Sequence, residues 1–66
     1  MSETVKFWLT DLFEREIKDA EVDISNNELW VKGSNTREEE LGYLQNIEDI
    51  KEYKAVLEQM LAEVNK

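Results

Sequence analysis

The chain has 66 residues, a net charge of −8, and no proline, cysteine or histidine. This length allows a single domain, residues 1–66, and the charge disfavours direct binding to nucleic acid or to an anionic membrane, because both depend on Lys and Arg. Without cysteine and histidine the chain lacks disulfides, thiolate nucleophiles, the commonest metal ligand and the commonest general base, so we expect no enzyme, no metal and no cofactor.

The first predicted element is an amphipathic helix over residues 3–20. Its apolar residues recur three and four positions apart, which gathers them on one face: Val5, Trp8, Leu9, Leu12, Phe13, Ile17 and Ala20. Phe7 falls outside this face, and we expect it to be exposed unless a partner covers it.

Residues 21–32 change to an alternating pattern of polar and apolar residues on either side of Asn26 and Asn27, which is strict in residues 21–25 and nearly so in residues 28–32. Asparagine tolerates the positive φ angles of a two-residue turn, so the pattern predicts a β-hairpin. The register would place four aliphatic residues on the face that packs against the helices and would leave Trp30 on the outer face.

A short polar connector, residues 33–35, precedes a second predicted helix over residues 36–65. Thr36 and Glu39 have the spacing of a capping box at its start. This helix would extend about 45 Å against about 26 Å for the first, so the first could not cover it. Its apolar positions form a heptad seam, in which spacings of three and four alternate: Tyr43, Ile47, Ile50, Lys54, Leu57, Leu61 and Val64.

Two interpretations of this seam remain open at the level of sequence. The seam either packs only on the rest of its own chain, or it extends past the first helix and pairs with a second copy, with Lys54 favouring one register or strand number. Small domains without disulfides or metals often depend on oligomerisation, which favours the second. The predicted self-association residues are Ile47, Ile50, Leu57, Leu61 and Val64, and Phe7 and Trp30 are predicted contacts for a partner.

The sequence thus predicts an α+β fold in the order helix, β-hairpin, long helix, and a small acidic, non-catalytic protein-interaction module that forms a homodimer. The alternative is an acidic inhibitor or nucleic-acid mimic, which would enter the basic groove of a nucleic-acid-binding protein. Its candidate phosphate-like residues are Glu14, Asp19, Glu21, Asp23, Glu48, Asp49, Glu52 and Glu58.

No stretch resembles a signal peptide or a transmembrane helix, so we expect a cytoplasmic location. In size and acidity the chain is similar to small accessory proteins of bacterial and phage genomes, although no motif assigns it to a family.

Overall fold

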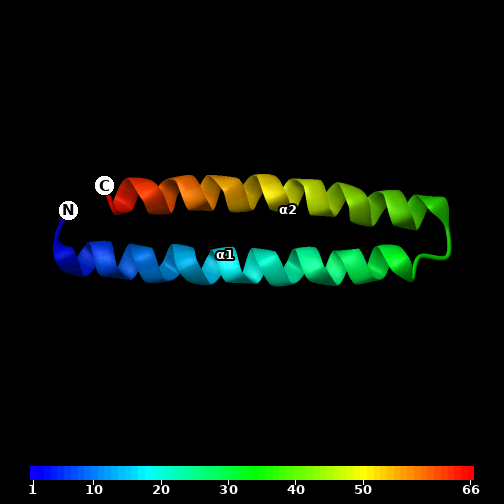
Figure 1. The fold of residues 1–66 in the computed structure, drawn as a ribbon, viewed down its shortest axis with the longest axis horizontal. Coiled ribbons are helices and arrows are strands. Elements are labelled where there is room, and N and C mark those ends of the chain that lie inside the picture. Colours follow the sequence, from blue (N-terminus) through cyan, green and yellow to red (C-terminus); the bar gives the residue numbers. More distant parts are fainter.

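A computed structural model describes residues 1–66 as two α-helices that lie side by side and run antiparallel (Figure 1). Helix α1 spans Glu3–Lys32 and helix α2 spans Arg37–Val64. A short loop joins them at one end, and both termini lie at the other end. The Cα atoms extend over 51 × 14 × 10 Å, so the molecule is a rod. Neither helix contains a stretch apolar enough to cross a lipid bilayer.

Both helices begin at a side-chain cap. The Ser2 hydroxyl accepts the backbone N–H of Val5 at 3.1 Å, and the Thr36 hydroxyl accepts that of Glu39, also at 3.1 Å. The predicted start of the second helix at Thr36 is confirmed. The Glu39 carboxylate does reach back across the cap, but it accepts the backbone N–H of Asn35 rather than that of Thr36.

The predicted β-hairpin over residues 21–32 is wrong, and with it the α+β fold, because α1 continues without a break to Lys32. Residues 3–32 contain no glycine or proline that could interrupt a helix, and α1 ends at its C-cap residue, Gly33. Asn26 and Asn27, predicted to form the turn, are ordinary helical residues. Asn27 faces α2, where its amide is buried and hydrogen-bonded.

The heptad seam on α2 packs against a second heptad seam on α1. All seven predicted positions of the α2 seam are buried or half-buried. The matching α1 positions, also spaced alternately four and three apart and also buried or half-buried, are Lys6, Thr10, Phe13, Ile17, Ala20, Ile24, Asn27 and Val31. This pattern on both helices is typical of an antiparallel coiled coil, here formed within one chain.

The predicted mismatch in helix length is also wrong. The 30 residues of α1 and the 28 residues of α2 correspond to about 45 and 42 Å, so each helix covers the other over its whole length. A pair of helices shields only one stripe on each, however. Only four residues are buried, and thirteen large hydrophobic side chains are exposed. The accessible surface is 5131 Å², against about 4400 Å² for a compact monomer of this mass.

Candidate interaction surface

The predicted self-association residues lie between the two helices of the same chain. Ile47 and Leu57 are buried, and Ile50, Leu61 and Val64 are half-buried in the seam that faces α1. Helix α1 therefore occupies the face of α2 that these residues were expected to offer to a second copy.

The two predicted partner contacts, Phe7 and Trp30, lie in different surroundings. Phe7 is 70% exposed, outside the seam. Trp30 is 51% exposed, and its ring centroid lies 5.6 Å from that of Tyr43 on α2, with the two planes inclined at 50°. This tilted aromatic pair is part of the packing between α1 and α2, so part of the Trp30 side chain is already covered within its own chain.

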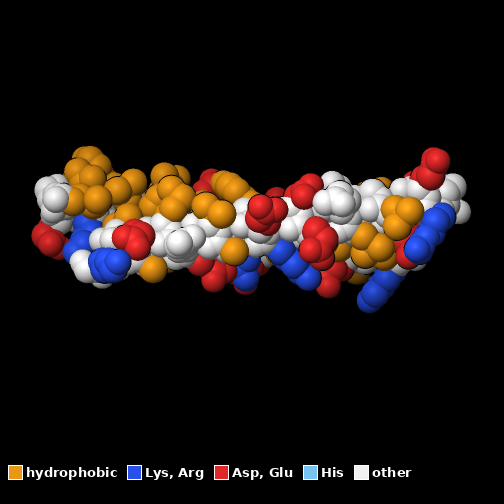
Figure 2. All heavy atoms as spheres, turned by 90° about the horizontal axis from the view of Figure 1, so that it is seen from above, with side chains coloured by type: hydrophobic (Ala, Val, Ile, Leu, Met, Phe, Trp, Pro, Cys, Tyr) orange, Lys and Arg blue, Asp and Glu red, His pale blue; other side chains and the backbone are white.

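An apolar surface that was not predicted from the sequence lies near the end of this two-helix hairpin that holds the termini. We call it the end patch and define it by six exposed side chains: Val5, Trp8 and Leu12 on α1, and Tyr53, Val56 and Met60 on α2. On each helix these residues are three, four or seven positions apart, so each set lies on one side of its helix. Figure 2 shows hydrophobic atoms massed along one edge of the rod toward the end that holds the termini.

Two contacts between the helices show how the two halves of the end patch are aligned along the rod. The Tyr53 hydroxyl donates to the Glu16 carboxylate at 3.4 Å, and the Asn65 amide donates to the Thr10 hydroxyl at 3.3 Å. These pairs fix the alignment of the antiparallel helices, in which Leu12, between Thr10 and Glu16, lies level with the segment around residue 60. The two halves therefore adjoin at Leu12 and Met60 and follow one another along one edge of the rod.

The size of the end patch is unusual for a chain this small. The exposed fractions of the six side chains, from 40% for Val5 to 64% for Trp8, amount to roughly 600 Å². This area reaches the upper end of the range for the largest patch on a typical monomer, about 300–600 Å². Patches of that size commonly mark interaction sites, so the end patch is the strongest candidate site on this molecule.

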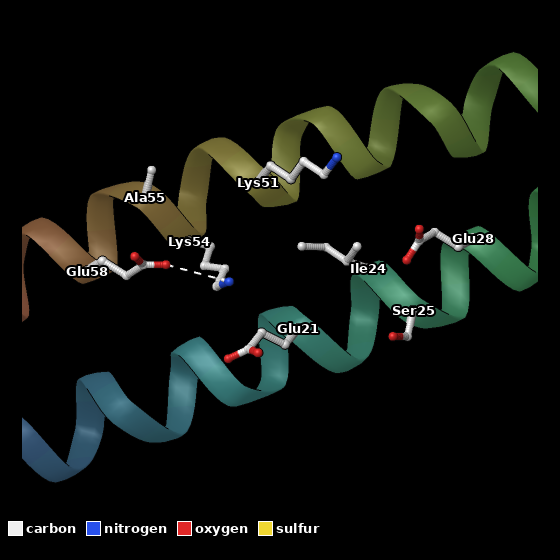
Figure 3. Close-up of a pocket in the computed structure, with 8 residues that line it drawn as sticks. All are labelled: Glu21, Ile24, Ser25, Glu28, Lys51, Lys54, Ala55 and Glu58. Carbon is white, nitrogen blue, oxygen red and sulfur yellow. Dashed lines mark ion pairs between the residues drawn. The ribbon is translucent and has the colours of Figure 1, made fainter.

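A polar groove of about 570 Å³ lies on another side of the rod, between the middle parts of the helices (Figure 3). Ile24 of α1 points into the space between the helices, and the Lys54 ammonium lies 3.6 Å from the Glu58 carboxylate on the same helix. Glu21, Glu28 and Lys51 also line the groove, together with Ser25 and Ala55. The groove carries both acidic and basic side chains, and these lie close to solvent, so its charges favour neither an anionic nor a cationic ligand.

The acidic residues proposed to mimic phosphates do not follow one line on the surface. Glu21 and Glu58 line the groove just described, whereas Asp23 and Asp49 line a second groove of about 320 Å³. Glu21 and Asp23 are two positions apart and so point about 200° apart around α1. No group of three acidic side chains is close enough together to hold a metal ion.

Charge pairing contributes little to how the helices recognise each other. All four ion pairs join residues three or four positions apart along the chain, on exposed or half-exposed side chains. Such pairs stabilise a helix by only a few tenths of a kcal/mol. The side-chain hydrogen bonds between the helices are those of Asn46 with Asn27, Tyr53 with Glu16 and Asn65 with Thr10.

The apolar seam and these few polar contacts therefore set the alignment of the two helices.

Comparison of the chain with protein-family models, with curated proteins and with solved structures finds no match.

Proposed function

We propose that this protein is a non-catalytic interaction module that self-associates, with two copies burying their end patches against each other. Two helical hairpins joined in this way form a four-helix bundle, in which each helix contacts more than one neighbour. The proposal keeps the homodimer predicted from sequence but moves its contact surface from the α2 seam to the end patch.

The observation that carries the proposal is the exposed apolar area of the end patch. Roughly 600 Å² of apolar side chain approaches the 800 Å² or so that each partner contributes to a standard stable interface, before any flanking polar contacts are counted. Trp8 and Tyr53 are of the residue types that dominate binding energy at interfaces. A second copy carries the same apolar surface, so any solution of the protein already contains a partner against which the end patch can be buried.

The proposal is tested by sedimentation equilibrium on the wild type and on two triple variants. The first changes the end patch: Trp8→Gln, Val56→Gln and Met60→Gln. The second is a matched control with three exposed apolar residues outside the end patch: Phe7→Gln, Val22→Gln and Leu29→Gln. Glutamine is a good helix former, so both variants should retain their helical circular dichroism.

We expect the wild type and the control to be dimers at about 100 µM and the end-patch variant to be a monomer. A monomeric wild type at that concentration would contradict the proposal, and so would a dimer that survives in the end-patch variant. Between about 50 mM and about 500 mM salt, the dimer of a protein with a net charge of −8 should keep its affinity or gain some, because salt screens the repulsion between copies. Binding driven by acidic residues would instead weaken.

A further inference from the structure

We infer that the two copies pair antiparallel and offset, overlapping only by the halves that carry their termini, so that the two loops point in opposite directions. This inference rests on the proposed function and adds the geometry of the dimer. It follows from where the end patch lies along the rod and from how charge is distributed between its two halves.

The position of the end patch excludes a full-length antiparallel overlap. Its residues lie at 5–12 of α1 and 53–60 of α2, all in the half of the rod that holds the termini. The groove that lies closer to the loop is lined by two carboxylates, Asp23 and Asp49, together with Asn27, Asn46, Trp30 and Ile50. A full-length antiparallel overlap would set the end patch of each copy against the loop half of the other rather than against its apolar counterpart. Burial against these carboxylates without partner cations is unfavourable, whereas burial of patch on patch is favourable.

Two symmetric arrangements bring one end patch onto the other. In the first, the two-fold axis runs along the rods, and the copies lie parallel over their whole length. In the second, the axis crosses the rods at the end patch, and only the terminal halves overlap. Both are isologous contacts, in which the same residues of the two copies meet.

Charge distinguishes these two arrangements. Residues 18–51, the loop half, contain nine acidic and four basic residues and carry a net charge of −5, whereas the remaining residues carry −3. The parallel arrangement sets two loop halves side by side at about the 10 Å distance of packed helices, close to the Debye length of about 8 Å at physiological salt. The offset arrangement separates the loop halves by several Debye lengths, which removes this repulsion.

The test is the distance between spin labels on single cysteines, measured by pulsed electron paramagnetic resonance on the full chain. The chain contains no cysteine, so each introduced cysteine gives one labelled site. Asn35→Cys places the label in the loop, and Thr4→Cys places it near the end patch; both positions are exposed. At 1.5 Å per residue, the offset dimer predicts roughly 70 Å between labels at position 35 and roughly 20 Å between labels at position 4.

The other outcomes overturn the inference in distinguishable ways. Short distances at both positions would show the parallel arrangement, and distances of roughly 40–50 Å at both would show full-length antiparallel overlap. Either result would refute the offset geometry and leave self-association standing. If the labelled protein and the unlabelled wild type both sediment as monomers, the proposed function is refuted, and this inference is refuted with it.

Discussion

Asn27 is the one polar residue buried between the helices, at 5% exposure. Its Nδ2 donates to the backbone carbonyl of Asp23 at 2.8 Å, and its Oδ1 accepts a hydrogen bond from the Asn46 Nδ2 at 3.3 Å. We predict that Asn27→Asp, which hardly changes the shape of the side chain, destabilises the hairpin strongly at neutral pH. The change turns the donor that faces Asp23 into an oxygen and buries a negative charge beside a carbonyl oxygen.

The contacts of Asn27 set the size of this effect. The Asp23 carbonyl keeps its helical hydrogen bond from the Asn27 backbone N–H, so losing the second one, from the side-chain amide, costs about 1 kcal/mol. A negative charge buried beside that carbonyl oxygen costs about 2–3 kcal/mol more. The hydrogen bond from Asn46 becomes charge-assisted and returns about 1 kcal/mol. A net loss of about 2–3 kcal/mol follows, which lowers the melting temperature of a domain this size by roughly 10–20 °C.

The loss should depend on pH. Burial disfavours the ionised form of the introduced carboxyl, so its pKa in the folded state lies above the unfolded value of about 3.9. The destabilisation is therefore complete above the folded pKa and shrinks as the pH falls toward the unfolded pKa. A protonated carboxyl can also donate to the Asp23 carbonyl and so replace the lost hydrogen bond.

Urea unfolding followed by circular dichroism, near pH 7 and at about pH 4, measures the effect at one fixed protein concentration. Asn35→Asp makes the same chemical change at an exposed position and serves as the control. Our reasoning fails if the two variants differ by less than about 0.5 kcal/mol near pH 7, within the usual range for surface substitutions. It also fails if the loss in Asn27→Asp does not shrink at low pH.

Three further changes test the hairpin. Gly42→Ala should raise the free energy of unfolding by about 0.5–1 kcal/mol, since the added Cβ meets nothing within 4 Å; an unchanged or lower melting temperature would contradict this. Leu57→Ala, in the buried seam, should cost about 2–4 kcal/mol in denaturant unfolding, against less than about 0.5 kcal/mol for the exposed Val22→Ala. Thr36→Ala removes the oxygen that accepts the Glu39 N–H, and it should lower stability by about 1 kcal/mol in the same assay.

The second helix was predictable because its signals are local. The cap at Thr36 and the alternation of three and four from Tyr43 to Val64 depend only on residues within a few turns of each other. The seam was identified correctly, but the neighbour that covers it was not. Which helix lies opposite a seam depends on contacts distant in sequence, such as those between Trp30 and Tyr43 and between Asn27 and Asn46.

The failure at residues 21–32 has a specific cause. Val22, Ile24, Leu29 and Val31 alternate as strand residues do, but Ile24 and Val31 also continue the helical seam that passes through Ala20. A segment this short satisfies both periods, and the choice lies with the preceding helix, which meets no glycine or proline to stop it. Shortening the first helix then produced the false length mismatch, on which the prediction of self-association through the α2 seam rested.

The first turns of α1 did carry a sign of the end patch. The apolar arc from Trp8 to Ile17 spans roughly 180° at 100° per residue, whereas a helix packed against one neighbour needs a stripe of about 100°. In the structure Ile17 is on the side that faces α2, and Trp8 and Leu12 face outward. An arc of this width suits a helix with two neighbours, and α2 is only one. In the dimer proposed above, a helix from the second copy is the other, so the width of the arc and the position of the end patch lead to the same partner.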